Sequence, residues 1–200
     1  MEDQSNGKTL FTFVTARRVL IVLSIVAIAA FFTLITLYSE RITAELGDTH
    51  AQFNLGVHYH DGDHGLPQDF AEAARWYYKA AEQGFAPAQN NLGALYWMGD
   101  GVPQDRAEAV RWHRKAAEQG DPNAQYNLGT SLAYGRGVPK DLQQAYVWLS
   151  LAVAQGDTKA HANQDFVASQ LDRESIANAQ RRAAEFVPKK QGKDILDTKR

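Results

Sequence analysis

The stretch that decides the fold is residues 88–120, which read AQNNLGALYWMGDGVPQDRAEAVRWHRKAAEQG. Its opening six residues recur upstream as residues 51–56 (AQFNLG) and downstream as residues 124–129 (AQYNLG). These starts are separated by 37 and 36 residues, a spacing typical of helical repeat proteins, in which each unit buries its apolar face against its neighbours. The one-residue difference is an insertion in the first unit's loop, around Asp63 and His64. The chain therefore predicts a stack of three similar units.

Each unit reads as two helices joined by a glycine-containing loop. In the first helix, apolar residues follow the helical spacing i, i+4, i+8, as at Ala51, Leu55 and Tyr59. The second helix begins after an aspartate, whose carboxylate accepts backbone N–H bonds, and it ends at a glycine suited to a left-handed backbone. The repeated structural residues are Gly56, Gly93 and Gly129 in the first helices, Asp69, Asp105 and Asp141 at the N-caps, and Trp76, Trp112 and Trp148 in the second helices.

The glycines inside the first helices predict close helix packing. A glycine in a helix interior costs up to about 1 kcal/mol relative to alanine. Because Gly56, Gly93 and Gly129 repeat this cost in all three units, we expect another helix to approach the backbone there. The tryptophans of the second helices would then fill the gap between units.

The full pattern is A-x-x-x-L-G-x-x-Y-x-x-G-x-G-V-x-x-D-x-x-x-A-x-x-W-x-x-K-A-A-x-x-G, and it resembles the Sel1-like repeat, a relative of the tetratricopeptide repeat. The resemblance implies an all-α fold, a right-handed α/α solenoid with repeats at 49–84, 85–120 and 121–156. A C-terminal pair of capping helices with a polar outer face is expected at 157–187, because a solenoid needs a closed end. The remaining residues, 188–200, are rich in bases, and we expect a disordered tail.

Residues 19–38 predict a membrane anchor. They contain no charged side chain, and twenty helical residues span about 30 Å, the thickness of a bilayer core. The expected organisation is a cytoplasmic tail at 1–18, a transmembrane signal-anchor helix at 19–38 in contact with lipid, and a linker at 39–48. Two alternatives remain, namely a cleaved signal peptide and a buried helix of a soluble domain.

The basic residues around this segment predict its orientation. Lys8, Arg17 and Arg18 precede it, whereas Arg41 is the single base close behind it. Because positive charge favours the cytoplasmic side, we expect a single-pass protein whose repeats are extracytoplasmic, or periplasmic in a bacterium.

The composition excludes several kinds of chemistry. The chain has no cysteine, so a disulfide scaffold, a thiolate zinc site, an iron–sulfur cluster and a cysteine nucleophile are all excluded. It also has no nucleotide-binding or hydrolase motif, and its net charge of −2 does not favour nucleic acid. We therefore expect no enzyme activity, no cofactor and no nucleic-acid partner.

Histidines gather in the first repeat. His50, His58, His60 and His64 lie there with Asp61 and Asp63 between them. Imidazole and carboxylate groups bind zinc, but a site needs three or four convergent ligands, and spacing along a loop does not establish convergence. We therefore expect no metal, and a metal sensor remains an alternative hypothesis.

The face of the first helices opposite the buried stripe is the candidate partner-binding surface. Its residues are Phe53, Val57, His60, Trp97, Tyr126 and Thr130. Trp97 is the tryptophan outside the repeat phase, so packing of the repeat does not require it, and exposed aromatic side chains commonly anchor interfaces. The alternative is that these aromatic residues fill the space between repeats.

The family resemblance implies a function in protein assembly. Related helical solenoids bind a peptide or a partner protein in the concave groove lined by their first helices. The favoured hypothesis is an adaptor or regulator of an envelope or signalling complex. The alternatives are a cell-wall or β-lactam-binding hydrolase-like protein and a purely structural spacer. The hydrolase-like branch of the family is rich in paired cysteines, and this chain has none.

Overall fold

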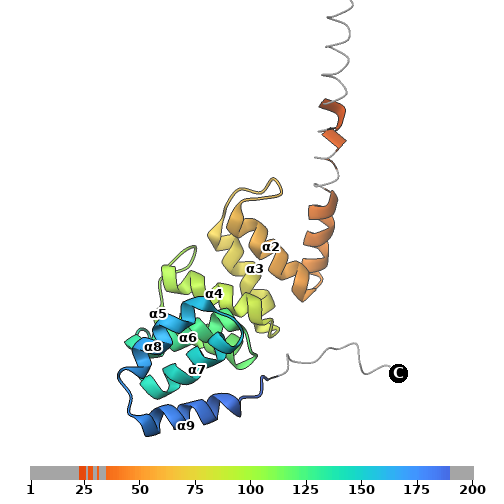
Figure 1. The fold of residues 1–200 in the computed structure, drawn as a ribbon. Coiled ribbons are helices and arrows are strands. Elements are labelled where there is room, and N and C mark those ends of the chain that lie inside the picture. The colour runs from red at the N-terminus through yellow and green to blue at the C-terminus, as the bar shows by residue number, and fades with distance from the viewer. Residues whose placement is uncertain (1–22, 26, 29–30, 32–34, 190–200) are drawn as a thin grey trace, which may run out of the picture.

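The computed structural model describes residues 23–25, 27, 28, 31 and 35–189, and all regular secondary structure in these residues is helical (Figure 1). Three helix pairs follow one another along the chain, and a fourth pair closes the stack. The helices are α2 (Thr49–Asp61), α3 (Phe70–Glu82), α4 (Ala86–Met98), α5 (Arg106–Glu118), α6 (Pro122–Tyr134), α7 (Leu142–Ala154), α8 (Thr158–Ala168) and α9 (Arg173–Ala184). This all-helical stack agrees with the solenoid that the repeat pattern predicts.

Aspartates begin the second helix of each pair. The carboxylate of Asp69 accepts hydrogen bonds from two backbone N–H groups at the start of α3, and Asp105 does the same at the start of α5. Asp141 accepts one from Gln144 at the start of α7. Each carboxylate satisfies donors that the helix itself leaves free, and it also suits the positive end of the helix dipole.

The two helices of each pair touch at the glycines inside the first helix. A methyl group added to Gly93 would lie 2.8 Å from the imidazole of His113, and one added to Gly129 would lie 2.8 Å from Leu149. At Gly56 the added group would collide with the ring of Tyr77. The second helix therefore packs directly on the backbone of the first, which accounts for a glycine in a helix interior.

The tryptophans lie between pairs, although not all to the same depth. Trp76 is 1% exposed and Trp112 is 3% exposed, and the ammonium groups of Lys79 and Lys115 lie over their rings. Trp148 is half-buried, and its ring meets Phe186 edge-on at 5.6 Å between centroids. The third tryptophan is thus covered by the C-terminal cap in place of a lysine.

Buried glutamines link each pair to the one before it. The amide nitrogen of Gln89 donates to the carbonyl of Ala81 at 3.0 Å, and its oxygen accepts from Gln119 at 2.7 Å. Gln125 makes the equivalent bonds to Ala117 and Gln155, at 3.3 and 2.8 Å. These side chains are 4% and 0% exposed. The glutamines therefore satisfy carbonyls at the ends of the preceding second helices, where no intrahelical donor is available.

Replacing Gln89 by leucine is expected to lower the free energy of unfolding by about 1–3 kcal/mol, because the Ala81 carbonyl and the Gln119 amide lose their buried partner. The exposed Gln170→Leu variant is the control, with an expected change within about 0.5 kcal/mol. Urea denaturation followed by circular dichroism measures both. Equal stability of the two variants would show that the buried amide contributes nothing.

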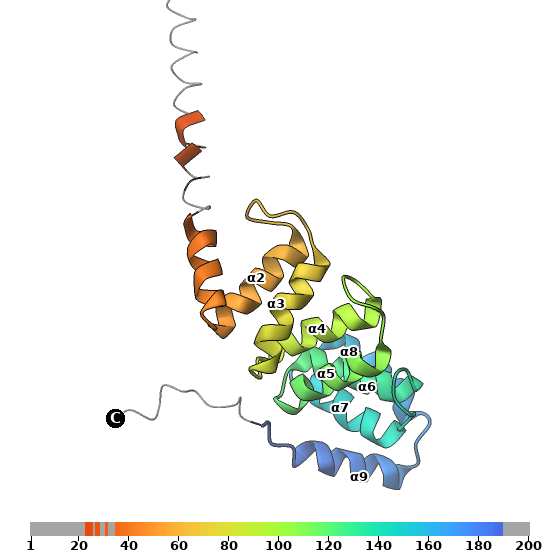
Figure 2. The ribbon, with the colours of Figure 1, turned by 180° about the vertical axis from the view of Figure 1, so that it is seen from behind.

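Residues 35–45 are helical and occupy the place of a second helix belonging to a preceding unit (Figure 2). The carbonyl of Ala44 accepts from Gln52 at 3.0 Å, just as Ala81 accepts from Gln89. Ala44 is 1% exposed and packs with Leu55 and Trp76. The segment at 39–48, expected to be a linker, is thus mostly a packed helix that closes the N-terminal end of the stack.

The predicted membrane anchor requires correction. No helix in the part of the chain that the structure describes is both long enough and apolar enough to span a bilayer. The helical residues 35–45 carry Glu40, Arg41 and Glu45, and their apolar side packs on the first repeat. The predicted localisation, a single-pass protein with a cytoplasmic N-terminus and extracytoplasmic repeats, is therefore wrong on this finding. Residues 1–18 and most of 19–38 lie outside the described residues.

The C-terminal end of the stack is covered by α8 and α9, which both pack on α7. The chain then turns back, and the backbone N–H of Lys189 donates to the carbonyl of Glu118 at 2.8 Å. The Lys189 ammonium also contacts the Glu118 carboxylate at 2.6 Å. Residues 188 and 189, the start of the expected disordered tail, are therefore docked on α5, and 190–200 lie outside the described residues.

Candidate functional site

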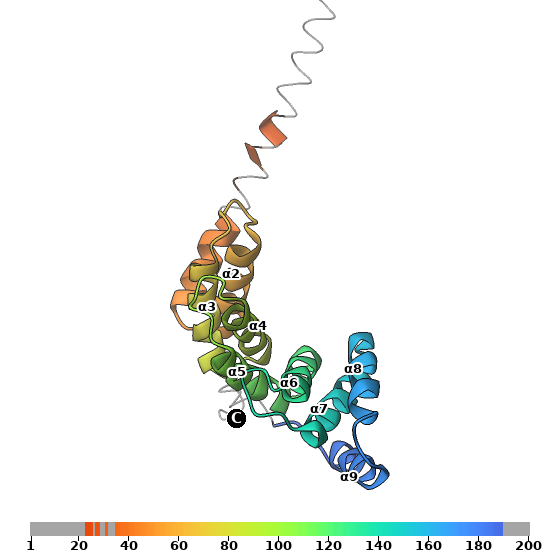
Figure 3. The same ribbon diagram turned by 90° about the vertical axis from the view of Figure 1, so that its left-hand side faces the viewer.

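The helix pairs follow an arc, and the first helices α4, α6 and α8 lie on its inner side (Figure 3). Two hollows open along this inner side. The Trp97 hollow has a volume of about 280 Å³ and is lined by Ala94, Trp97, Met98, His113, Asn127, Thr130, Ser131 and Arg136. The Tyr126 hollow has a volume of about 500 Å³ and is lined by Asn90, Pro122, Asn123, Tyr126, Asn127, Gln155, Gly156, Asp157, Thr158 and Lys159. Because Asn127 lines both hollows, the two are adjacent along α6.

Three of the predicted partner-binding residues lie in these hollows. Trp97 and Thr130 both line the smaller hollow, and Tyr126 lines the larger one. The guanidinium of Arg106 lies 5.4 Å from the centroid of the Trp97 ring. Trp97 is half-buried, so part of its ring remains available to a ligand.

The other three predicted residues lie at the first repeat and line neither hollow. The Phe53 ring packs against Tyr77 and Phe85, at 5.8 and 5.1 Å between centroids. Val57 packs against the same apolar cluster, and His60 meets the Phe70 ring edge-on at 5.3 Å. The first-repeat residues therefore contribute to packing between helices, as the alternative interpretation of these aromatic residues holds.

His113 is a residue of the inner side that the sequence does not single out. It is 2% exposed, and its Nδ1 has no hydrogen-bond partner in the part of the chain that the structure describes. Burial lowers the pKa of His113 to about 4, because the charged imidazolium is poorly solvated there. The floor of the Trp97 hollow therefore carries a neutral imidazole at physiological pH.

Amide and hydroxyl groups continue the inner side from one helix to the next. The Asn127 amide donates to Asn90 on α4 at 3.1 Å, and the Asn163 amide of α8 donates to Thr130 on α6 at 3.0 Å. Amides both donate and accept, so the surface can hydrogen-bond to either kind of peptide backbone group.

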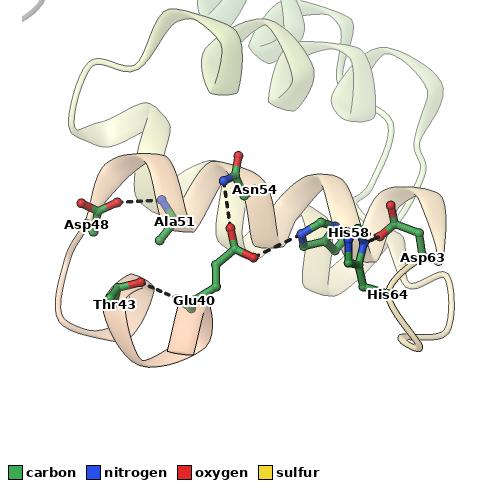
Figure 4. A network of polar contacts seen from close by, with 8 residues as sticks. All are labelled: Glu40, Thr43, Asp48, Ala51, Asn54, His58, Asp63 and His64. Atoms are coloured by element: carbon green, nitrogen blue, oxygen red, sulfur yellow. Dashed lines mark hydrogen bonds and ion pairs between the residues drawn. The ribbon is translucent and has the colours of Figure 1, made fainter. Parts of the chain in front are cut away.

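A separate polar cluster lies at the first repeat (Figure 4). The imidazole of His58 has one nitrogen, Nδ1, 2.7 Å from the Asp63 carboxylate and the other, Nε2, 3.2 Å from Glu40. The Nδ1 atom of His64 lies 3.0 Å from the same Asp63 oxygen. The hydrogen bond from His64 is the largest effect on the pKa of Asp63, and together with the smaller contribution of His58 it holds that pKa below its usual value, against an opposing effect of burial.

Only some of the first-repeat histidines converge. His58 and His64 meet at Asp63, and their ligand atoms together with that of Asp63 lie within 4.8 Å of one another. His50 packs against the Phe85 ring, and His60 faces Asp61. The convergence that a metal site requires is thus present in His58, Asp63 and His64.

Comparison with known proteins identifies the repeats. The family model described as Sel1 repeat matches residues 49–85, 86–121 and 122–157. A crystal structure of a Sel1 repeat protein from Oxalobacter formigenes is 42% identical over 65% of this chain and 97% of that chain, with a TM-score of 0.60.

A second similar structure is c5321, a protective antigen of uropathogenic Escherichia coli strains that displays an SLR fold. It is 29% identical over 79% of this chain, with a TM-score of 0.48, and this chain spans 42% of its length. No curated protein matches the chain.

Proposed function

This chain belongs to the Sel1 repeat family, and on that premise we propose that it is an adaptor that binds an extended segment of a partner protein along α4 and α6. Sel1 repeats generally mediate protein–protein binding. The observation that carries the proposal is the Trp97 hollow, where a half-buried tryptophan ring and the exposed Ala94 and Met98 leave apolar surface available on the inner side of the arc.

The chemistry of the inner side defines the segment that it suits. An apolar side chain fits the Trp97 hollow against Ala94 and Met98. The amides of Asn90 and Asn127 suit the polar backbone of an extended peptide. The cations Arg136 and Lys159 line the two hollows and favour acidic residues beside the apolar anchor. The proposed ligand is an extended segment with one apolar anchor flanked by acidic residues.

Replacing Trp97 by alanine is expected to weaken binding of such a peptide by about 30-fold, equivalent to about 2 kcal/mol, because aromatic residues dominate interface energetics. The peptide is selected from a displayed random library against the full chain, and calorimetry then measures its dissociation constant. The matched control is Tyr78→Ala, which removes an exposed aromatic side chain from α3, and its affinity should remain that of the unmodified chain.

Two results would contradict the adaptor proposal. One is that Trp97→Ala binds every selected peptide as tightly as the unmodified chain. The other is that Trp97→Ala lowers the free energy of unfolding by as much as a core tryptophan would, which is about 3–5 kcal/mol, because Trp97 would then be a packing residue. A structural spacer predicts that no peptide binds saturably.

A further inference from the structure

We propose that the first repeat binds a divalent transition-metal ion of the zinc type through Nδ1 of His58, the Asp63 carboxylate and Nδ1 of His64, with Glu40 orienting His58. This site is separate from the inner side of the arc and is independent of the adaptor proposal. The sequence alone leaves convergence open, and the structure supplies it, since the three ligand atoms lie within 4.8 Å of one another.

The distances suit a small cation. Asp63 Oδ1 lies 2.7 Å from one histidine nitrogen and 3.0 Å from the other. Zinc binds nitrogen and oxygen at about 2.0–2.2 Å in a tetrahedron, which requires ligand atoms about 3.3–3.6 Å apart. Binding of the ion would therefore lengthen the two contacts to Asp63 by less than about 1 Å and bring the two histidine nitrogens, which lie within 4.8 Å of each other, to the same spacing.

The two histidines depart from the repeat, so packing of the repeat does not explain them. The residues equivalent to His58 are Leu95 in the second unit and Ser131 in the third, and both are buried. His64 is the inserted residue of the first unit's loop. It is also the non-glycine residue with positive φ, 52°, among the residues that the structure describes. Such a backbone conformation is uncommon outside glycine and is a frequent feature of functional sites.

Glu40 provides the second shell that a metal-bound histidine usually has. Its carboxylate lies 3.2 Å from Nε2 of His58, which leaves Nδ1 for the ion (Figure 4). The other Glu40 oxygen accepts from Asn54 at 2.8 Å, so the carboxylate is held in place. A histidine that ligates a metal typically donates its second N–H to a carboxylate, which fixes the tautomer and the ring orientation.

The exposure of the cluster allows an ion to enter. The side chains of Asp63 and His64 are 44% and 45% exposed, whereas that of His58 is 15% exposed. Three protein ligands leave a fourth position for water. Two imidazoles and one carboxylate favour zinc and its neighbours over magnesium and calcium, which prefer oxygen ligands.

The test is calorimetric titration of the full chain, freed of metal with a chelator, with Zn²⁺ and separately with Mg²⁺. We expect one Zn²⁺ per chain and no saturable Mg²⁺ binding. Glu40→Gln keeps an acceptor for Nε2 but removes the charge, and it should weaken Zn²⁺ binding by about 10- to 100-fold. His64→Gln removes a ligand and should weaken binding further. His60→Gln is the matched control, because His60 lies in the same repeat but faces Asp61, and its affinity should be unchanged.

The outcomes separate the proposal from its alternatives. Stoichiometric binding that His64→Gln weakens more than Glu40→Gln does, and that His60→Gln preserves, supports the site. Absence of saturable Zn²⁺ binding overturns it, and so does binding that depends on His60. Circular dichroism spectra of each variant establish that the helices are intact, so a loss of affinity is attributable to the ligand that was removed.

Discussion

Replacing Gly101 by alanine is expected to lower the free energy of unfolding by about 3 kcal/mol, through left-handed strain and an overlap that the backbone cannot relieve. Gly101 lies in the loop between α4 and α5 with φ at 69°. A methyl group there would collide with the backbone of Phe70 and Ala71, at the start of α3. Because backbone atoms cannot rotate aside, the loop itself must move away from the preceding unit.

The equivalent glycine of the first unit provides the control. Gly65 has φ at 85°, but a methyl group added there would meet nothing within 4 Å. Gly65→Ala should therefore incur the conformational cost alone, about 1–2 kcal/mol. Urea denaturation at neutral pH measures the difference. Equal losses at the two positions would show that the contact between the Gly101 loop and α3 does not contribute to stability.

Lowering the pH from 7.5 to 4.5 is expected to remove about 2–3 kcal/mol of stability through His113 alone. Its pKa is about 4 in the folded chain, against an ordinary value of 6.5 in the unfolded chain. Between these two values the unfolded state binds a proton that the folded state does not. The contribution of the neutral His113 to the free energy of unfolding is therefore fully present above pH 6.5 and is lost as the pH falls toward 4.

The matched variant for this prediction is His113→Leu, because Leu149 occupies the equivalent position of the third unit. Urea denaturation at both pH values measures how much unfolding free energy each protein loses between pH 7.5 and 4.5. The loss of unfolding free energy should be smaller in the variant by about 2–3 kcal/mol, since every other titratable group is the same in the two proteins. A loss of the same size in the two proteins would contradict the assignment of this pH dependence to His113.

Much of the fold is predictable because the same structural residues occur at equivalent positions in all three units. Glycine, aspartate and tryptophan recur in phase, and each has a local physical role that can be read without coordinates. The all-helical stack and the family are confirmed by the structure and the comparisons. The buried glutamines also recur in phase, at Gln52, Gln89 and Gln125, so their role could have been found from the same alignment of units.

The N-terminal end is where the sequence misleads. Residues 44–47, Ala-Glu-Leu-Gly, match residues 81–84, Ala-Glu-Gln-Gly, which end the second helix of the first unit. Four residues are a weak signal beside a long apolar run, so hydropathy dominates the prediction. Hydropathy alone cannot show that the end of such a run packs against a protein surface, as Leu37 does.

The site is less predictable than the fold. Trp97 stands out in the sequence because it breaks the repeat phase. His113 does not stand out, because its equivalents are Tyr77 and Leu149, and a variable position gives no signal. Convergence of His58 with His64 depends on the course of a loop, and Glu40 approaches from a helix in the segment expected to be a linker. Contacts of this kind require coordinates.

The helix at residues 35–45 has a consequence for any fragment of this protein. A fragment beginning at Thr49, the first residue matched by the family model, lacks the surface that covers Leu55 and Trp76. It also lacks the Ala44 carbonyl that pairs with Gln52, and it lacks Glu40 beside His58. Such a fragment would expose the apolar surface around Leu55 and Trp76 that residues 35–45 cover. End-to-end association of two copies through this surface is the expected result. A fragment that keeps this end of the stack covered therefore has to include residues 35–45 as well as the three repeats.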